Sequence, residues 1–522
     1  MFCNVGWRLA LLFACVGVAF EPRSVYAEVK VPAAISKGMV LQRDMLVPIW
    51  GTAEPGEKVA VKFRDQEKST IADENGKWAV KLDRLKAGGP DTLTVTGKNT
   101  LKLDDVLVGE VWVGSGQSNM QGTVNSYMKS DPVLAKLANE SYPKIRLITA
   151  GRGGWQESNA KSNQSFSALM FAFGVRLNQE LDVPVGLMVG AVGGTPSGYW
   201  LSDEMLAKDD ACQQVIKKAG ATVSFEEQKA KYDAALTLWE KAVEQAKKDD
   251  KPAPKKPQAP AKAGQVQGKV GHLYEAHIKP FQPFAIRGVV WDQGESGTAV
   301  SGLDQYTLMG ALIRGWRLAW GQGEFPFIFI QKPSGGGCAW NYDDPIMTAA
   351  DKFAKLPASV PPASAGFYRD NHIRIKNYPN TAMAITSDLG PGIHPINKSG
   401  YGTRASQVAL GMVYGRKGEY YGPVYQSHKS EGNKIRITFD HAGQGLAFKN
   451  GEALQGFAIA GADKNFVWAD AVIDGNAVVL SSLKVTEPVA VRYAWSQTHP
   501  WANLFNRDGL PALPFRTDSW EK

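Results

Sequence analysis

The chain has 522 residues, and because a single hydrophobic core stops growing at roughly 250–300 residues, we expect two or three domains. Apolar residues make up 44% of the chain and charged residues 21%, which is typical of a soluble globular protein. After the first thirty positions no run approaches the ~20 apolar residues of a membrane span, and the net charge of +8 comes from scattered basic residues outside any known nucleic-acid-binding module. The composition therefore excludes an integral membrane protein and disfavours a nucleic-acid partner.

Residues 1–27 have the pattern of a signal peptide. Arg8 supplies a positive charge, the apolar run 9–20 is too short to span a bilayer, and Val25-Tyr26-Ala27 satisfies the small-residue rule at a cleavage site. We expect cleavage after Ala27 and a secreted or periplasmic protein.

The four cysteines limit the covalent chemistry. Cys15 could anchor a lipoprotein, but the apolar run continues past it, which disfavours that alternative. Cleavage would remove Cys3 and Cys15 and leave Cys212 and Cys338, which can form one disulfide or stay as two unpaired thiols. Their wide spacing does not match the clustered ligands of a zinc site, so we expect no structural metal.

Residues 28–105 consist of short runs in which apolar and polar residues alternate, such as 59–63 and 78–82. Turn-forming sequences separate these runs, among them Asp-Glu-Asn-Gly at 73–76 and Gly-Gly-Pro at 88–90. The pattern predicts a small antiparallel β-sandwich.

Residues 106–419 change character, because continuous apolar runs now alternate with stretches of helical periodicity. This pattern predicts an α/β fold in which a parallel sheet is covered by helices on both faces. The chemistry of such sheets lies on loops at the carboxyl ends of the strands, so residues directly after the apolar runs are the first candidates for a site. The apolar runs are 106–113, 183–192, 286–291, 325–330 and 382–386.

An insertion at about 203–270 interrupts this plan. Ser224 and Glu227 form a capping box, and an amphipathic helix with an apolar stripe follows as far as about Asp250. Residues 251–263 are rich in Pro, Ala and Lys and predict an extended, mobile linker. We expect a surface insertion without a catalytic role, and what it binds stays open. The stripe consists of Tyr232, Leu236, Trp239 and Val243.

Alternating strand patterns return in residues 420–522, in runs such as 435–439, 477–480 and 489–493. No tandem repeat of fixed period accompanies them. They predict a second β-rich domain.

The run 114–120, Gly-Ser-Gly-Gln-Ser-Asn-Met, directly follows the first apolar run of the middle region. Glycines around a serine at a strand end let the chain turn sharply and present the hydroxyl, and the helix that follows can offer N–H groups to an oxyanion. A Gly-rich turn alone is more often only a turn. Ser118 is the candidate nucleophile.

A nucleophilic serine needs a general base, and His394 lies in a suitable place. It follows the apolar run 382–386 in a short loop, so we expect it at the same sheet edge as Ser118. The other histidines of the mature chain lie near the end of the insertion, beside charged residues, or in the final β-rich region and its margins. We predict that His394 takes the proton of Ser118.

Two further strand ends carry groups that can bind an oxyanion. The run 190–195, Gly-Ala-Val-Gly-Gly-Thr, offers backbone N–H groups, and the run 291–296, Trp-Asp-Gln-Gly-Glu-Ser, offers an amide beside two acids. Each oxyanion donor contributes roughly 3–4 kcal/mol to acyl transfer. Four complementary loops at one sheet edge predict an acyl-transfer site.

Taken in order, these motifs resemble the sialate O-acetylesterase family of SGNH-type hydrolases. The resemblance implies a flavodoxin-like α/β/α sandwich, residues 106–419, between an N-terminal β-sandwich and a C-terminal β-rich domain. It covers nearly the whole chain after the signal peptide. The segments that carry it are 39–43, 108–112, 116–120, 193–196, 291–296, 393–395, 509–512 and 514–518.

The resemblance also implies a hydrolase without a cofactor, which removes O-acetyl groups from carbohydrate through an acetyl-enzyme. Ser118 would be the nucleophile and His394 the base. The oxyanion would be held by the Ser118 N–H, by the N–H of Gly193 or Gly194, and by the side-chain amide of Gln293. Sialic acid is favoured as the sugar by the resemblance alone.

The chain departs from the family pattern at the third member of the catalytic triad. Many related hydrolases have an Asp two or three residues before the histidine, where this chain has Gly392 and Pro391. Asp388, Glu295 and a Ser–His dyad oriented through a backbone carbonyl are the alternatives, and Asp388 is the first choice. Asp292 also stands where similar proteins often have a tyrosine.

Other functions fit parts of the sequence. An esterase for acetylated xylan or another polysaccharide would use identical chemistry, and a noncatalytic glycan-binding protein would account for the missing acid. A metal-dependent deacetylase would need a cluster of His and Asp ligands, which the sequence does not offer. The sugar, the hydroxyl position and the oligomeric state stay open.

Overall fold

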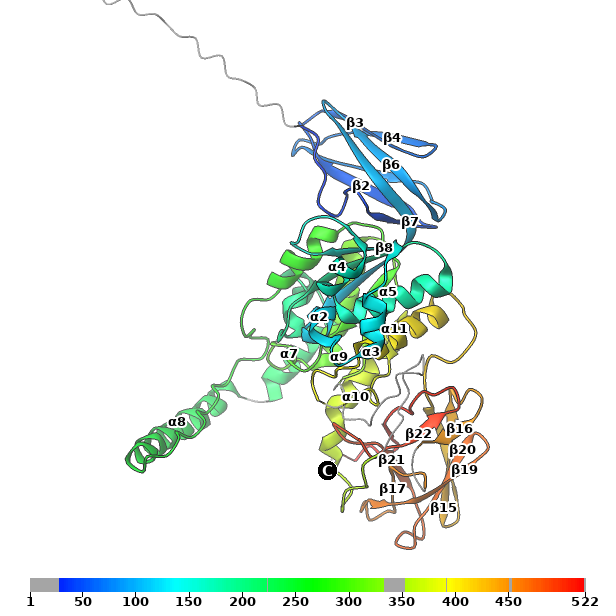
Figure 1. Ribbon diagram of the computed structural model, residues 1–522. Helices are drawn as coiled ribbons and strands as arrows, with labels where there is room; N and C mark the ends of the chain where they lie inside the picture. Colours follow the sequence, from blue (N-terminus) through cyan, green and yellow to red (C-terminus); the bar gives the residue numbers. More distant parts are fainter. Residues whose placement is uncertain (1–27, 223, 333–352, 391, 450–452, 521–522) are drawn as a thin grey trace, which may run out of the picture.

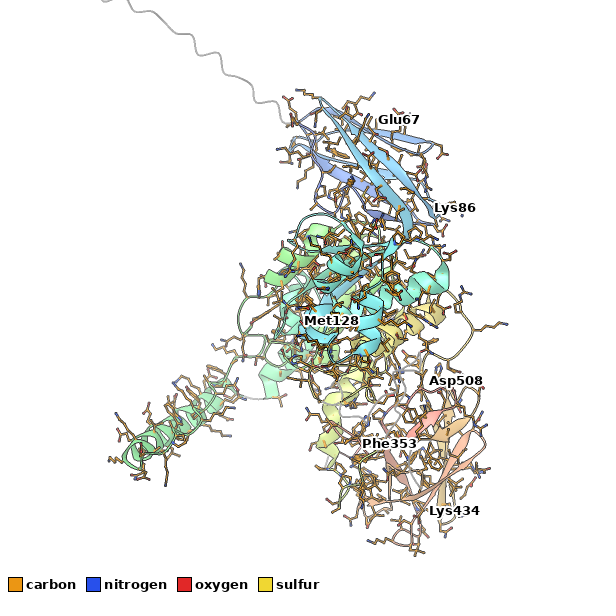
Figure 2. All side chains as sticks on the ribbon, viewed as in Figure 1. Glu67, Lys86, Met128, Phe353, Lys434 and Asp508 are labelled. Atoms are coloured by element: carbon orange, nitrogen blue, oxygen red, sulfur yellow. The ribbon has the colours of Figure 1, made fainter. Side chains whose placement is uncertain are left out.

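The computed structural model describes residues 28–222, 224–332, 353–390, 392–449 and 453–520. The predicted signal peptide and Cys338 lie outside these residues. A mixed α/β body with a central, mostly parallel sheet lies between a β-rich region at the start of the chain and β-rich sheets at its end (Figure 1). Glu67 of the first region and Lys434 of the last lie at opposite ends of the molecule (Figure 2). The predicted α/β class is confirmed at this level.

The first β-rich region has strands in which buried and exposed side chains alternate, as the sequence predicts. In β3 (Lys58–Phe63) and β5 (Lys77–Leu82) every second residue is buried. Strand β5 pairs with β2, while β3 belongs to a second layer with β1, β4, β6 and the start of β7. The remaining bounds are β1 (Val40–Gln42), β2 (Val47–Thr52), β4 (Gln66–Ile71), β6 (Gly88–Thr96) and β7 (Thr100–Gly116).

Strand β7 joins this region to the central sheet because it belongs to both. Its first half pairs antiparallel with β6, and its second half runs parallel to β10 on one side and β11 on the other. One hydrophobic core continues from the first region into the α/β body. Strand β7 crosses the expected boundary at residue 105, and the division of the chain at residues 105 and 419 stays a prediction.

The central sheet has the order β13-β12-β11-β7-β10-β8-β9, and every neighbouring pair except β8 and β9 is parallel. Strands β10, β11, β12 and β13 are almost entirely buried, which explains their continuous apolar sequences. The carboxyl ends of the parallel strands therefore meet at one edge. The bounds are β8 (Tyr142–Thr149), β9 (Gln156–Ser158), β10 (Val185–Ala191), β11 (Gly288–Asp292), β12 (Phe327–Ile330) and β13 (Thr381–Ala384).

Helices cover both faces of this sheet. Helices α5 (Ala168–Leu181) and α11 (Lys398–Met412) pack against each other on one face. Helix α9 (Gln305–Trp320) covers the other, where Trp316 packs edge-on against Trp291 of β11 with 5.8 Å between the ring centroids. No helix in the described part of the chain is long and apolar enough to cross a membrane.

The shorter helical elements lie in the loops between these strands and helices. They are α1 (Ser118–Gln121), α2 (Val124–Tyr127), α3 (Pro132–Ala138), α4 (Ala160–Gln164), α6 (Asp203–Ala207), α7 (Asp210–Thr222), α10 (Phe367–Arg374), η1 (Ser197–Trp200), η2 (Tyr274–Ile278), η3 (Lys279–Phe281), η4 (Ala363–Gly366) and η5 (Ile375–Asn377).

Helix α8 (Phe225–Lys248) projects away from the body (Figure 1). It begins at the predicted cap, because the Ser224 side chain accepts a hydrogen bond from the Glu227 N–H at 3.3 Å. None of its residues is buried, so its apolar stripe does not pack on the body. The Trp239 indole instead donates to the Pro254 carbonyl at 2.7 Å. The linker thus returns along the helix.

The described residues at the end of the chain form two four-stranded antiparallel sheets and one two-stranded sheet, which enclose a second hydrophobic core. This agrees with the predicted β-rich region. One sheet contains β14 (Val424–Glu431), β15 (Lys434–Asp440), β19 (Asp470–Asp474) and β20 (Ala477–Ser481); the second contains β17 (Phe457–Ala460), β18 (Val467–Trp468), β21 (Ala490–Tyr493) and β23 (Phe515–Arg516); the third contains β16 (Leu446–Phe448) and β22 (Leu504–Asn506).

Candidate active site

Ser118 lies where β7 ends and α1 begins, at the carboxyl edge of the central sheet. Gly116 makes this turn possible: its φ is +128°, and a Cβ there would lie 2.0 Å from the Asp292 carbonyl oxygen. The Gln117 N–H donates to the same carbonyl at 2.8 Å, which ties the turn to β11. The Ser118 N–H is at the first helical position and has no partner among the described residues.

His394 reaches the same edge from the loop between β13 and α11. Its Nε2 lies 2.8 Å from Ser118 Oγ, although the two residues are 276 positions apart. An Nε2 that accepts the serine proton requires the ring hydrogen on Nδ1. In the described part of the chain Nδ1 has no hydrogen-bond partner, and the ring is exposed. The pair therefore has the contact that proton transfer from the hydroxyl needs.

Asp388, the first candidate for the orienting acid, is engaged elsewhere. Each of its carboxylate oxygens accepts a hydrogen bond of 2.7 Å from the Arg404 guanidinium, and both side chains are buried. No hydrogen bond joins Asp388 to His394 within the described residues. Its role as the triad acid stays a prediction, and this geometry does not favour it.

The two glycines predicted to bind the oxyanion lie on the loop after β10. Gly193 is next to the nucleophile, since a Cβ on it would lie 3.4 Å from Ser118 Cβ. Its N–H donates to Gln121 Oε1 at 2.9 Å. The exposed Gly194 has a φ of +71°, and its N–H has no partner among the residues described. Gly194 is therefore the glycine whose N–H is open to a ligand.

Gln293 uses both of its amide hydrogens in contacts other than with Ser118. The buried side chain donates to the Thr195 carbonyl at 3.3 Å and to the Gly297 carbonyl at 3.1 Å. Its Oε1 accepts from Gln305 at 2.9 Å. In this arrangement Gln293 braces the loop after β10 against the loop after β11.

A group of charged and polar side chains, buried except for the half-buried Glu295, lies at the same edge, and we call it the Lys332 cluster: Lys332, Asp292, Glu295 and Gln117. Lys332 Nζ lies 2.6 Å from Asp292 Oδ1 and 3.0 Å from Glu295 Oε1. Glu295 also accepts from the Gln117 amide. Sequence reasoning missed Lys332, although it follows the apolar run 325–330 and so meets the strand-end criterion.

Burial and opposite charges act against each other in this cluster. Burial lowers the pKa of Lys332, but the carboxylates of Asp292 and Glu295 outweigh burial, and the pKa ends above its ordinary value. Burial raises the pKa of Asp292, and Lys332 offsets only part of that rise. Each charge therefore depends on its partner, because removing one would leave the other buried and uncompensated.

Lys398 is a second buried lysine that sequence reasoning did not select. Its Nζ donates to the Pro395 carbonyl at 2.6 Å and to Asn119 Oδ1 at 2.8 Å. Burial lowers its pKa to about 7, and the attraction of Asp292 opposes that shift. Nothing in the local sequence distinguishes it from a solvated lysine, because its partners come from other loops.

These groups are suited to acyl transfer. A serine hydroxyl touches an imidazole, and backbone N–H groups without partners lie on two adjacent loops, where they can stabilise a developing oxyanion. Within the described ranges, no group of three or more His, Cys, Asp or Glu side chains is placed to hold a metal ion. The chemistry that the geometry supports is attack of Ser118 on an ester carbonyl.

Comparisons with known proteins extend over nearly the whole chain. No protein-family model matches it. The sialate O-acetylesterase of Mus musculus is 27% identical over 95% of this chain and 96% of its own length. That of Homo sapiens is 26% identical over 95% of this chain and 94% of its own length. The predicted resemblance to the sialate O-acetylesterases is confirmed.

A solved structure that is similar to this chain is also that of an acetylesterase. A carbohydrate acetylesterase from Xanthomonas citri is 29% identical, with a TM-score of 0.71 over 94% of this chain and 100% of that one. The prediction of a carboxylic ester hydrolase is thereby confirmed.

Proposed function

We propose that this protein is a serine esterase that hydrolyses O-acetyl esters of carbohydrate, with Ser118 as nucleophile and His394 as general base. The observation that carries the proposal is the 2.8 Å contact between Ser118 Oγ and His394 Nε2 at the carboxyl edge of the sheet. The relatives supply the substrate class, because they are named as acetylesterases of sialate and of carbohydrate.

The reaction begins at the contact between Ser118 Oγ and His394 Nε2. Ser118 Oγ attacks the acetyl carbonyl carbon while its proton passes to His394 Nε2. The tetrahedral intermediate collapses, the bond to the sugar oxygen breaks, and the imidazolium returns the proton to that oxygen. Water then gives its proton to His394 and attacks the acetyl-enzyme, which releases acetate and restores the Ser118 hydroxyl.

The Ser118 N–H and the Gly194 N–H are the donors best placed for the oxyanion, because neither has a partner among the described residues. Gly193 and Gln293, which we also assign to the oxyanion site, can join them only by exchanging an existing hydrogen bond for one to the substrate. A small movement of the loop after β10 would suffice for Gly193, since it already lies beside Ser118.

A Ser–His dyad without a third member agrees with this geometry better than a triad completed by either acid. Asp388 gives both carboxylate oxygens to Arg404, and Glu295 pairs with Lys332. A dyad leaves the imidazole without a carboxylate at Nδ1, so something other than an acid must hold the ring in place.

We also infer an SGNH-type arrangement for the α/β body. If β8 and β9 are set aside, which lie between β7 and β10 in the chain and extend the sheet beyond β10, then strands β7, β10, β11, β12 and β13 have the spatial order 2-1-3-4-5 that flavodoxin-like sheets show. The loops that follow the first, second and third of these strands carry Ser118, Gly194 and Gln293, and His394 follows the fifth. This placement supports the expected α/β/α sandwich.

Sialic acid is the sugar we favour, because the curated relatives are named for sialate. An acetylated polysaccharide is the alternative within the same chemistry. An exported protein suits either glycan, and we retain the inference that residues 1–27 are a signal peptide and that the mature chain is secreted or periplasmic.

Purified mature chain and a Ser118→Ala variant test the proposal with a chromogenic acetate ester and a panel of acetylated glycans, with released acetate as the readout. We expect the wild type to release acetate and the variant to lose at least 99.9% of that rate, roughly the 10³-fold effect of removing a catalytic nucleophile. Equal turnover by both proteins would refute the serine mechanism. Glycan binding without turnover by either would indicate a binding protein.

A further inference from the structure

The loop that carries His394 is tied to the neighbour of the nucleophile on both sides of the imidazole. Asn119 Nδ2 donates at 2.9 Å to the carbonyl of Ile393, the residue before the histidine. Lys398 Nζ donates at 2.6 Å to the carbonyl of Pro395, the residue after it. The same Nζ donates to Asn119 Oδ1 at 2.8 Å, which links the two side chains to each other. We call these three hydrogen bonds the Asn119–Lys398 clamp.

The clamp is buried and has little freedom. Asn119 and Lys398 are both 0% exposed. The Lys398 Nζ also lies over the rings of Tyr127 and Tyr401, at 4.5 Å and 5.0 Å from their centroids. Hydrogen bonds between buried polar groups are stronger than those in water, and leaving either partner unpaired is costly. The backbone on each side of His394 is therefore held at a defined distance from the turn at Ser118.

The imidazole has no comparable support of its own. Its Nε2 contacts Ser118 Oγ, and its Nδ1 has no partner in the described part of the chain. A ring with one side-chain hydrogen bond takes its position from the backbone that carries it. The two carbonyls that the clamp binds belong to the residues directly before and after this ring.

We propose that Asn119 and Lys398 are positioning residues of the esterase, and that their clamp sets the His394 imidazole against Ser118 in the role that an acid side chain has in a triad. This inference rests on the proposed function, since it concerns the same Ser118–His394 pair. Neither residue touches the acetyl group; both act through the loop at 393–395.

The first test compares Asn119→Leu and Lys398→Met with the wild type in steady-state turnover of an acetate ester. Leu and Met retain much of the side-chain volume and remove the polar contacts. We expect kcat to fall roughly 10- to 100-fold, as a displacement of about 1 Å does at a catalytic pair, and KM to change less than about threefold. Unchanged kcat in both folded variants would overturn the proposal.

A matched control separates positioning from general stability. Asn163 is also 0% exposed, and its amide donates to the carbonyls of Ala138 and Glu140, each at 3.1 Å. Asn163→Leu therefore removes a similar set of buried contacts from helix α4. We expect it to lower the unfolding midpoint about as much as Asn119→Leu while kcat per folded molecule stays within about twofold. An equal loss of kcat in both variants would make the effect structural and would contradict the clamp.

A double-mutant cycle with His394→Ala tests whether the clamp acts through the histidine. Once the imidazole is gone, Asn119→Leu should change the residual rate by less than about twofold, because the residue has nothing left to position. A further tenfold loss in that background would show a role independent of His394 and would overturn the inference.

A second variant covers the case in which Asn119→Leu does not fold. Asn119→Asp keeps an acceptor for Lys398 but places a carboxylate oxygen against the Ile393 carbonyl, so we expect kcat to fall about tenfold in a folded protein. Wild-type kcat in Asn119→Asp, with Ser118→Ala inactive, would refute the clamp alone. Retained turnover in Ser118→Ala would instead refute the proposed function.

Discussion

Two groups of polar side chains share the carboxyl edge of the sheet and differ in burial and in the number of their partners. Ser118 and His394 form one hydrogen bond, and the imidazole is exposed. In the Lys332 cluster, Lys332 is fully buried and lies between the carboxylates of Asp292 and Glu295. The side chains of the reactive pair thus have few hydrogen-bond partners of their own, and those of the charged cluster have several.

The difference has a physical basis. A nucleophile must exchange its hydrogen bond for a bond to the substrate, so a single contact with an imidazole leaves it able to react. A buried ion pair has the opposite requirement, because losing one partner leaves an uncompensated charge in a medium of low dielectric constant. We therefore expect substitutions in the first group to change rate, and substitutions in the second to change stability.

The largest expected effect is on the rate, and it comes from a substitution in the reactive pair. Ser118→Ala should lower kcat for an acetate ester at least about 10³-fold and change the free energy of unfolding by less than about 0.5 kcal/mol. Ester turnover and urea denaturation on the same preparation measure both quantities. A destabilisation of several kcal/mol would show that Ser118 is structural and would break the distinction.

The Lys332 cluster should respond in the opposite way. Lys332→Met leaves Asp292 buried without its cation, and we expect the free energy of unfolding to fall by about 3–5 kcal/mol. At a temperature where the variant is folded, kcat should fall less than tenfold. Denaturant melts together with rates per folded molecule check both, and an equally stable variant would mean that the contacts of the cluster do not stabilise the fold.

A substitution at Asp388 tests whether this residue behaves like the reactive pair or like the buried charges. Asp388→Asn keeps one acceptor for Arg404 and loses the charge, so we expect about 2–3 kcal/mol of destabilisation and turnover within tenfold of the wild type. Thermal melts and steady-state kinetics give the answer. If turnover instead fell as far as we expect for Ser118→Ala while stability stayed unchanged, Asp388 would belong to the catalytic triad.

The last prediction concerns pH, where the effect per pH unit is small. Lys398 has a pKa of about 7 in the folded chain and a pKa near its ordinary value of about 10.4 when unfolded. Between these values the unfolded chain binds more protons, so the Lys398 contribution makes the free energy of unfolding rise with pH, by at most about 1.4 kcal/mol per unit. Lys332 has a raised pKa and stays charged in both states across this range.

Urea titrations between about pH 7.5 and about pH 9.5 measure this slope. Lys398→Met removes the titrating group, so the stability of the wild type should rise relative to that of the variant across the range. Parallel curves for the two proteins would contradict a lowered pKa at Lys398.

Much of the fold could be predicted because its signals are local. The alternating runs at 59–63 and 78–82 became β3 and β5, and the cap at Ser224 begins α8. Ser118 and His394 could be selected because each follows a buried strand, and parallel strands bring their carboxyl ends to one edge. These inferences need only periodicity, capping and the geometry of a parallel sheet.

The partners of the buried polar groups could not be predicted in this way. Asp388 was the first choice for the triad acid from its distance in sequence to His394, but Arg404 of α11 takes both of its oxygens. Gln293 was selected for its amide, and two backbone carbonyls hold that amide. In each case the competing partner lies in a position that no local pattern reveals.

The sequence by itself therefore indicated the buried strands β7, β10, β11, β12 and β13 and the side chains that follow them, although not β8. Tertiary structure alone decided which of those side chains remain reactive. A hydroxyl, an amide or a carboxylate becomes available to a substrate only if no neighbour from another loop has already bound it. That depends on contacts between segments as far apart as Asn119 and Lys398, whose hydrogen bond spans 279 positions of the chain.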